Sequence, residues 1–166
     1  MFKEDDIGRL TLAMIQFDGG DPKRVQHFLK VHSFAHLICV MEGVDEDTRY
    51  ITECAALVHD VGIIPAERKL GRCDGKAQEE EGPFYARQVL EEAGVREGFY
   101  DRICYLVGHH HTYSAIDGTD FAILVEADFL VNFYEDGAGR DAIRSAYDKI
   151  FRTQSGKKLC REIFAL

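Results

Sequence analysis

Apolar residues recur at three- and four-residue spacings through almost the whole chain, and no segment shows the regular alternation of a half-buried strand. The first such stretch spans about 5–17 and ends at Gly19-Gly20. Asp21-Pro22 then supplies an N-cap and a proline for the first helical position, so a second helix is expected to run to about Gly43. The pattern predicts an all-α fold, built as a bundle of helices.

Further helices have start and stop signals of their own. Asp45 or Asp47 can cap a third helix, whose apolar positions lead into His59-Asp60 before Gly62 and Pro65 end it. The remaining helices are expected at about 83–93, 97–110, 140–152 and 156–165, and around Asp128 after a Gly118-Thr-Asp cap. Residues 66–78 contain two glycines, four basic residues and no sustained periodicity, which indicates a loop.

Length and composition are those of a soluble globular protein. The chain has 166 residues, of which 46% are hydrophobic and 30% charged, and this favours one domain over 1–166. The formal charge of -9 disfavours a long nucleic acid as partner but not a free nucleotide. A homo-oligomer is left open.

Two further observations concern the cellular compartment. The five cysteines form no Cys-x-x-Cys pair, and several fall in apolar helical patterns, so we expect buried free thiols. The sequence begins with the acidic Met1-Phe-Lys-Glu-Asp-Asp, and no apolar stretch reaches the roughly 20 residues that a membrane helix needs. We expect a cytoplasmic protein with no membrane partner.

Histidine and aspartate residues fall on three separate predicted helices. His59-Asp60 ends one apolar helix, His27 lies in the second turn of an earlier helix, and Asp128 lies within a later apolar one. Because burying an unpaired carboxylate is costly, we expect a cation between Asp60 and Asp128. Imidazoles and carboxylates together suit a divalent transition metal such as Fe, Mn, Zn, Co or Ni.

The order His27, His59-Asp60, His109-His110 and Asp128 resembles that of the HD-domain superfamily of metal-dependent phosphohydrolases, over about 21–136. The resemblance implies an HD-type helical bundle in which His27, His59, Asp60 and Asp128 hold one metal ion. His32 and His36 compete for the first position, but on one helix they are rotated by about 140° and 180° from His27. Arg24-Val25-Gln26-His27 matches the family pattern, so His27 is preferred and His32 is the replacement.

The run His109-His110-His111 resembles the His-His element of relatives that bind two metals. We expect His109 and His110 to bind different ions, or one a metal and the other substrate, unless they only donate hydrogen bonds to ligands. For His111 a phosphate contact or a solvated position is expected. Such relatives usually carry another histidine before the glycine corresponding to Gly82, but here Gln78-Glu79-Glu80-Glu81 precede it, so a second metal is possible rather than required.

Positive charge is concentrated beside the His-Asp pair. Arg68, Lys69, Arg72 and Lys76 lie in the expected loop, which therefore either binds a phosphate group at the metal opening or is an ordinary solvated loop. The function predicted is hydrolysis of a small phosphate ester, most plausibly a nucleotide phosphomono- or diester, with Asp60 or a glutamate such as Glu81 assisting deprotonation of water. The alternatives are a di-iron oxygenase and a catalytically silent module that senses metal or nucleotide.

Overall fold

The computed structural model describes residues 3–166, with side chains from residue 6 onward, so the first two residues of the acidic N-terminal segment considered above lie outside it. Over the described residues the chain forms nine α-helices and two short 3-10 helices and no strand. Their bounds are α1 Lys3–Phe17, α2 Pro22–Glu42, α3 Glu46–Val58, α4 Ile63–Leu70, α5 Gly75–Ala93, η1 Glu97–Phe99, α6 Tyr100–Val107, η2 Tyr113–Ala115, α7 Thr119–Glu135, α8 Arg140–Lys149 and α9 Gln154–Phe164. The prediction of an all-α, single-domain bundle is confirmed.

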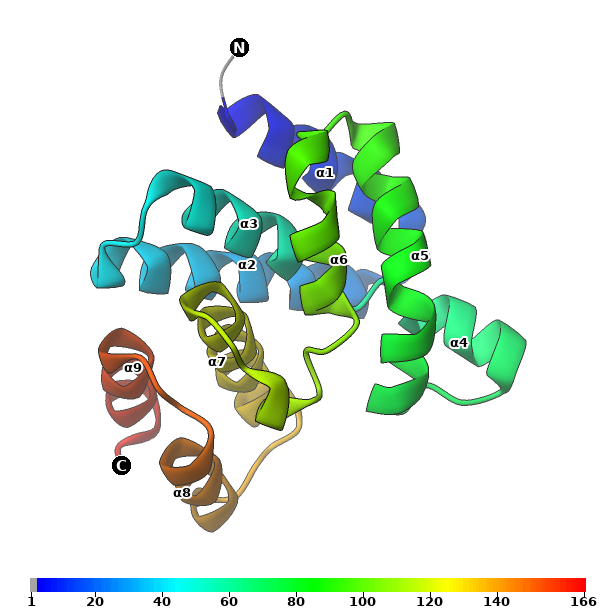
Figure 1. The fold of residues 1–166 in the computed structure, drawn as a ribbon. Helices are drawn as coiled ribbons and strands as arrows, with labels where there is room; N and C mark the ends of the chain where they lie inside the picture. The colour runs from blue at the N-terminus through cyan, green and yellow to red at the C-terminus, as the bar shows by residue number, and fades with distance from the viewer. Residues whose placement is uncertain (1–2) are drawn as a thin grey trace.

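Helices α3 and α7 lie in the middle of the bundle (Figure 1). Residues 54–58 at the end of α3 are fully buried, and on α7 Phe121, Ile123, Leu124 and Ala127 are fully buried as well. Helix α2 packs against both, α6 covers α3 from another side, and α9 packs against α2 and α7. The carboxyl end of α3 therefore lies deep in the molecule, where the apolar packing holds it in place.

Several helix boundaries follow the local signals of the sequence. Asp21 caps α2 by accepting the backbone N–H of Arg24 at 3.1 Å, and α2 ends at Gly43 in the left-handed conformation with φ 65°. Of the two candidate caps for α3, Asp45 is the one that accepts, from the N–H of Thr48 at 2.9 Å. These caps set the start of the two helices that lead into the site.

The prediction of a loop over 66–78 is wrong. Helix α4 continues to Leu70, and α5 already begins at Gly75, capped by Asp74, so Pro83 lies inside α5 instead of at its start. Pro83 has no N–H to give to the carbonyl four residues earlier, a local cost that close packing must offset. Its ring lies against Gly108, where an added Cβ would come within 2.9 Å of Pro83 Cγ.

Four of the five cysteines are buried and all are free, while Cys73 is exposed in the α4–α5 connection. Burial raises the pKa of the Cys39 thiol to about 12, which keeps that thiol protonated. Among the described residues, no helix is both long and apolar enough to cross a lipid bilayer.

Candidate metal centre

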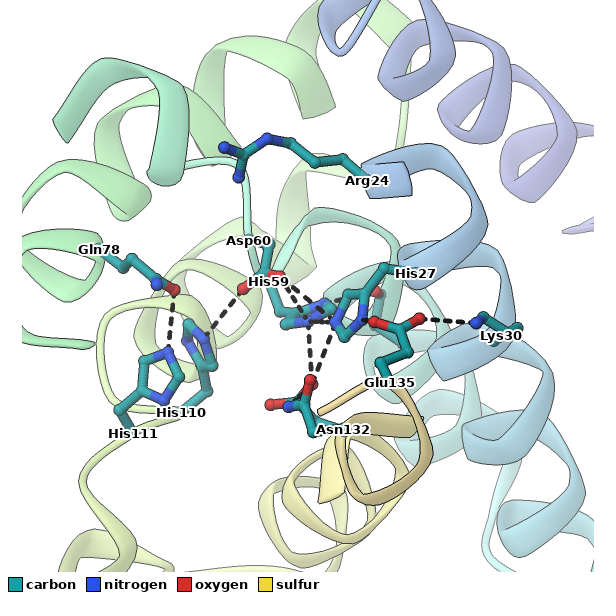
Figure 2. A network of polar contacts seen from close by, with 12 residues as sticks. Arg24, His27, Lys30, His59, Asp60, Gln78, His110, His111, Asn132 and Glu135 are labelled. Atoms are coloured by element: carbon teal, nitrogen blue, oxygen red, sulfur yellow. Dashed lines mark hydrogen bonds and ion pairs between the residues drawn. The ribbon is translucent and has the colours of Figure 1, made fainter. Parts of the chain in front are cut away.

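His59 and Asp60 stand at the end of α3, where the helix turns toward α4 (Figure 2). His59 is fully buried, and its Nδ1–H donates to the carbonyl of Ala56 at 2.8 Å. Because the acceptor is a carbonyl, a hydrogen must be on Nδ1, and in the neutral ring the lone pair on Nε2 faces the interior.

Helices α2 and α7 bring His27 and Asp128 to the same point. His27 Nε2 lies 3.2 Å from His59 Nε2, 3.3 Å from Asp60 Oδ2 and 3.2 Å from Asp128 Oδ1. His59 Nε2 lies 3.4 Å from Asp60 Oδ2 and 3.5 Å from Asp128 Oδ1. The four side chains expected from the sequence to hold one ion therefore converge.

This arrangement needs a positive charge at its centre. Two imidazole nitrogens at 3.2 Å cannot both present lone pairs to each other and to carboxylates without a proton or a cation between them. Burial alone would lower the pKa of His59, yet the carboxylates of Asp60 and Asp128 outweigh it and raise this pKa to about 9. Burial likewise opposes ionisation of Asp60, but His59 and His110 lower its pKa to about 2. The nitrogen and oxygen donor set fits a divalent transition metal.

A second group shares Asp60 with the first. Asp60, His110 and His111 also have ligand atoms within 4.8 Å of one another. His110 Nδ1–H donates to the carbonyl of Val107 at 2.8 Å, and His110 Nε2 lies 3.6 Å from Asp60 Oδ1. That Nε2 is buried and has no hydrogen-bond partner, so it is an orphaned polar atom directed at Asp60.

Side chains of α5 hold the turn that carries the histidine run. His111 Nε2 lies 2.9 Å from Gln78 Oε1, and Glu79 accepts from the backbone N–H of His111 at 3.0 Å and from the Thr112 hydroxyl at 2.9 Å. Burial, with His110 next, lowers the pKa of His111 to about 4, so His111 is neutral at physiological pH. Gln78, one of the four residues before Gly82, therefore contacts the histidine run directly.

The other histidines lie elsewhere. The structure does not bring His109 into either group, since its ring stacks on Tyr105 at 4.1 Å and its Nδ1–H donates to the Tyr105 carbonyl at 2.7 Å. His32 and His36 both contact Glu53, with N···O distances of 3.3 and 2.8 Å. His32 is half-buried and His36 is exposed, and both lie away from the group formed by His27, His59, Asp60 and Asp128.

The four cations of the expected phosphate loop are not at the opening. Arg68 and Lys69 line a different pocket, beside Tyr85. Lys69 pairs with Glu81 at 2.8 Å, so the Glu81 carboxylate is engaged there instead of facing the histidines. Arg72 pairs with Asp74, and Lys76 is exposed in the first turn of α5. The reason is that these residues are mainly helical, and the helices turn the side chains away from the site.

The opening itself is a cleft of about 290 Å³ above His27, Asp60 and Asp128. The lining residues that the sequence analysis did not assign to the site are Asp21, Lys23, Arg24, Ile63, Gln78, Asn132, Glu135 and Asp136. Helical spacing could have identified some of them. Asn132 and Glu135 follow Asp128 by four and seven residues, which places all three on one face of α7, and Arg24 precedes His27 by three.

Comparison with known proteins agrees with the family resemblance noted in the sequence. A family model described as the HD domain matches residues 24–149, which extends the match beyond the expected 136 to the end of α8. No curated protein matches the chain. Among solved structures, the chain is similar to the crystal structure of a predicted HD superfamily hydrolase from an uncultured Thermotogales bacterium. The identity is 24% and the TM-score 0.63, covering 98% of this chain and 84% of that one.

Proposed function

Because this chain belongs to the HD-domain family, we propose that it is a metal-dependent phosphohydrolase that acts on a small phosphate ester such as a nucleotide. The observation that carries the proposal is the convergence of His27, His59, Asp60 and Asp128, with nitrogen and oxygen atoms 3.2 to 3.5 Å apart. Buried carboxylates and imidazole lone pairs in such a group favour a cation over an apolar filling.

His27, His59, Asp60 and Asp128 would hold the ion, and Asp60 with His110 and His111 could hold a second one. A divalent metal supplies a Lewis acid there, which lowers the pKa of water and stabilises negative charge on a phosphoryl oxygen. Fe, Mn, Zn, Co and Ni all suit these donors.

Asp60 has the position and the charge state to orient the attacking water. It is ionised at neutral pH, since its pKa is held near 2, so it accepts hydrogen bonds but is a weak base. On its other side His110 Nε2 has no partner, and with the hydrogen on Nδ1 this nitrogen offers a lone pair to a second ion or to the O–H of a water molecule. Of the two candidates from the sequence, Asp60 and Glu81, the proposal keeps Asp60 as the group next to the water.

Lys23 and Arg24 take over the role proposed for the cations of 68–76. Both line the cleft above Asp60, and Figure 2 shows Arg24 extending from α2 over this region. The Arg24 guanidinium is also held by Asp21 at 2.9 Å and by Glu67 at 3.3 Å. A guanidinium fixed in this way presents its remaining donors to a phosphate group at little entropic cost.

Elemental analysis of protein purified without added metal, followed by a screen of nucleotides and simple phosphomonoesters, tests the proposal. We expect at least one transition metal per chain and metal-dependent phosphate release. Asp60→Ala should reduce turnover below detection and leave the helical circular dichroism unchanged. Wild-type turnover in that variant would contradict the proposal, and turnover that requires dioxygen would support the di-iron alternative instead.

A further inference from the structure

His27 has a carboxylate behind it as well as in front of it. Its Nδ1–H donates to Glu135 Oε2 at 2.9 Å, and the other oxygen of Glu135 accepts from Lys30 Nζ at 2.6 Å. Glu135 belongs to the last turn of α7, and Lys30 lies one turn after His27 on α2. Figure 2 shows the three side chains in a row that leads away from Asp60.

This row determines which nitrogen of His27 is free. Ionised carboxylates flank both ring nitrogens and can only accept, but Glu135 is the nearest of them, at 2.9 Å from Nδ1 against 3.2 and 3.3 Å for the aspartates at Nε2. The hydrogen of a neutral His27 ring is therefore on Nδ1, and the lone pair is on Nε2, which faces His59, Asp60 and Asp128. The side chains of His27 and Glu135 are only 10% and 14% exposed, so water competes little for this hydrogen bond. Lys30 in turn fixes the carboxylate and stabilises its charge.

The three imidazoles directed at Asp60 differ in this respect. His59 and His110 give their Nδ1–H to main-chain carbonyls, those of Ala56 and Val107, whereas His27 gives it to a charged side chain. A carboxylate partner raises the basicity of a ligating imidazole more than a neutral carbonyl does, in addition to orienting the ring. His27 is therefore expected to be the strongest nitrogen donor of the set.

We propose that Glu135, held by Lys30, is a positioning residue that fixes the tautomer and orientation of His27 and thereby strengthens metal binding at the centre. The proposal rests on the proposed function to the extent that an ion binds at His27. It assigns a side chain to the site that touches neither the ion nor the reacting atoms.

Metal affinity of three variants tests this role. Co²⁺ is titrated into the metal-free wild type, Glu135→Ala, Glu135→Gln and Glu53→Gln, with a competing chelator. Glu135→Ala should bind about 10- to 100-fold more weakly, and Glu135→Gln should fall in between, since its amide oxygen still accepts but carries no charge. Glu53→Gln is the matched control, because Glu53 also accepts from two histidines but away from the site, and its affinity should equal that of the wild type. Wild-type affinity in both Glu135 variants would overturn the proposal.

A second measurement does not depend on the metal. The ¹⁵N chemical shifts of the His27 ring, recorded on metal-free protein at a pH high enough to leave the ring neutral, should report hydrogen on Nδ1 in the wild type and a shift toward the other tautomer in Glu135→Ala. An unchanged tautomer would also overturn the proposal. A wild type that binds no metal but loses the tautomer in the variant would contradict the proposed function and leave the positioning role of Glu135 supported.

Discussion

Arg24 and Arg72 carry the same charge, and each pairs with a nearby aspartate, but of the two Arg24 lies at the cleft. Arg24→Ala should therefore raise KM for a phosphate ester by roughly 10-fold or more, from the 1.5 to 3 kcal/mol typical of hydrogen bonds to a charged group. Arg72→Ala is the control and should leave KM unchanged. Steady-state kinetics of the two variants measure both KM values. Equal effects of the two substitutions would show that Arg24 does not bind the phosphate group.

Asp18 gives a pH dependence whose sign can be worked out. This residue lies just after α1 and is 5% exposed, and burial, opposed by Arg24 and reinforced by Asp60, raises its pKa from 3.8 to about 6. Between these two values the folded chain binds a proton that the unfolded chain has lost, so stability falls as pH rises through this window. The penalty is fully present above about pH 6 and absent below about pH 4.

Asp18→Asn removes this penalty. In metal-free protein the variant should melt above the wild type at pH 8, by on the order of 2 to 4 °C, which corresponds to about 1 kcal/mol for a domain of this size. At pH 4 the two should melt together. Asp148→Asn, at an exposed position on α8, should show no such trend. Calorimetry at the two pH values measures the effect, and a difference that grows toward low pH would mean that Asp18 is stabilised as the carboxylate.

At the scale of the elements, the connection after the His-Asp pair packs directly on α5. A Cβ added at Gly62 would lie 2.5 Å from the carbonyl oxygen of Gln78 and 2.8 Å from the nitrogen of Gly82, both backbone atoms that cannot move independently. Gly62→Ala should therefore destabilise the fold by about 1 to 3 kcal/mol and weaken metal binding, because α5 must shift away from Asp60. Gly98→Ala, with no atom within 4 Å of the added Cβ, is the control for both measurements. Unchanged melting of Gly62→Ala would show that the two backbones separate freely.

Local signals explain which elements could be predicted from sequence. The caps at Asp21 and Asp45 act within one turn of their helices, so the start of α2 and of α3 can be identified without tertiary information. The first two turns of α5 could not, because Pro83 looks like a helix start and is kept inside the helix by contacts with a distant residue, Gly108. Missing those turns made 66–78 look like a loop.

At the scale of the whole molecule, the site also has features that local signals predict and features that depend on the packing of distant helices. His27, His59, Asp60 and Asp128 could be grouped because their order along the chain resembles that of the HD-domain superfamily, and each lies on or directly after a helix with a buried apolar face. Which cations face the cleft depends on how α4 and α5 are oriented, and no local pattern gives that orientation. On α7 and α2, by contrast, helical spacing could have placed Glu135 from Asp128 and Arg24 from His27 on the correct face.

A metal ion at this centre would join α2, α7 and the end of α3, three elements far apart in sequence. Because a site made of separate helices exists only in the folded chain, metal binding should add about 2.7 kcal/mol of stability at a free metal concentration 100 times Kd. For a domain of this size that corresponds to a rise in the unfolding midpoint of roughly 5 to 10 °C over chelator-treated protein. Asp128→Asn, which removes one charged ligand and keeps the shape of the side chain, should show a much smaller rise, and calorimetry with and without metal measures both. Identical melting curves of the wild type with chelator and with metal would contradict an ion held between these helices.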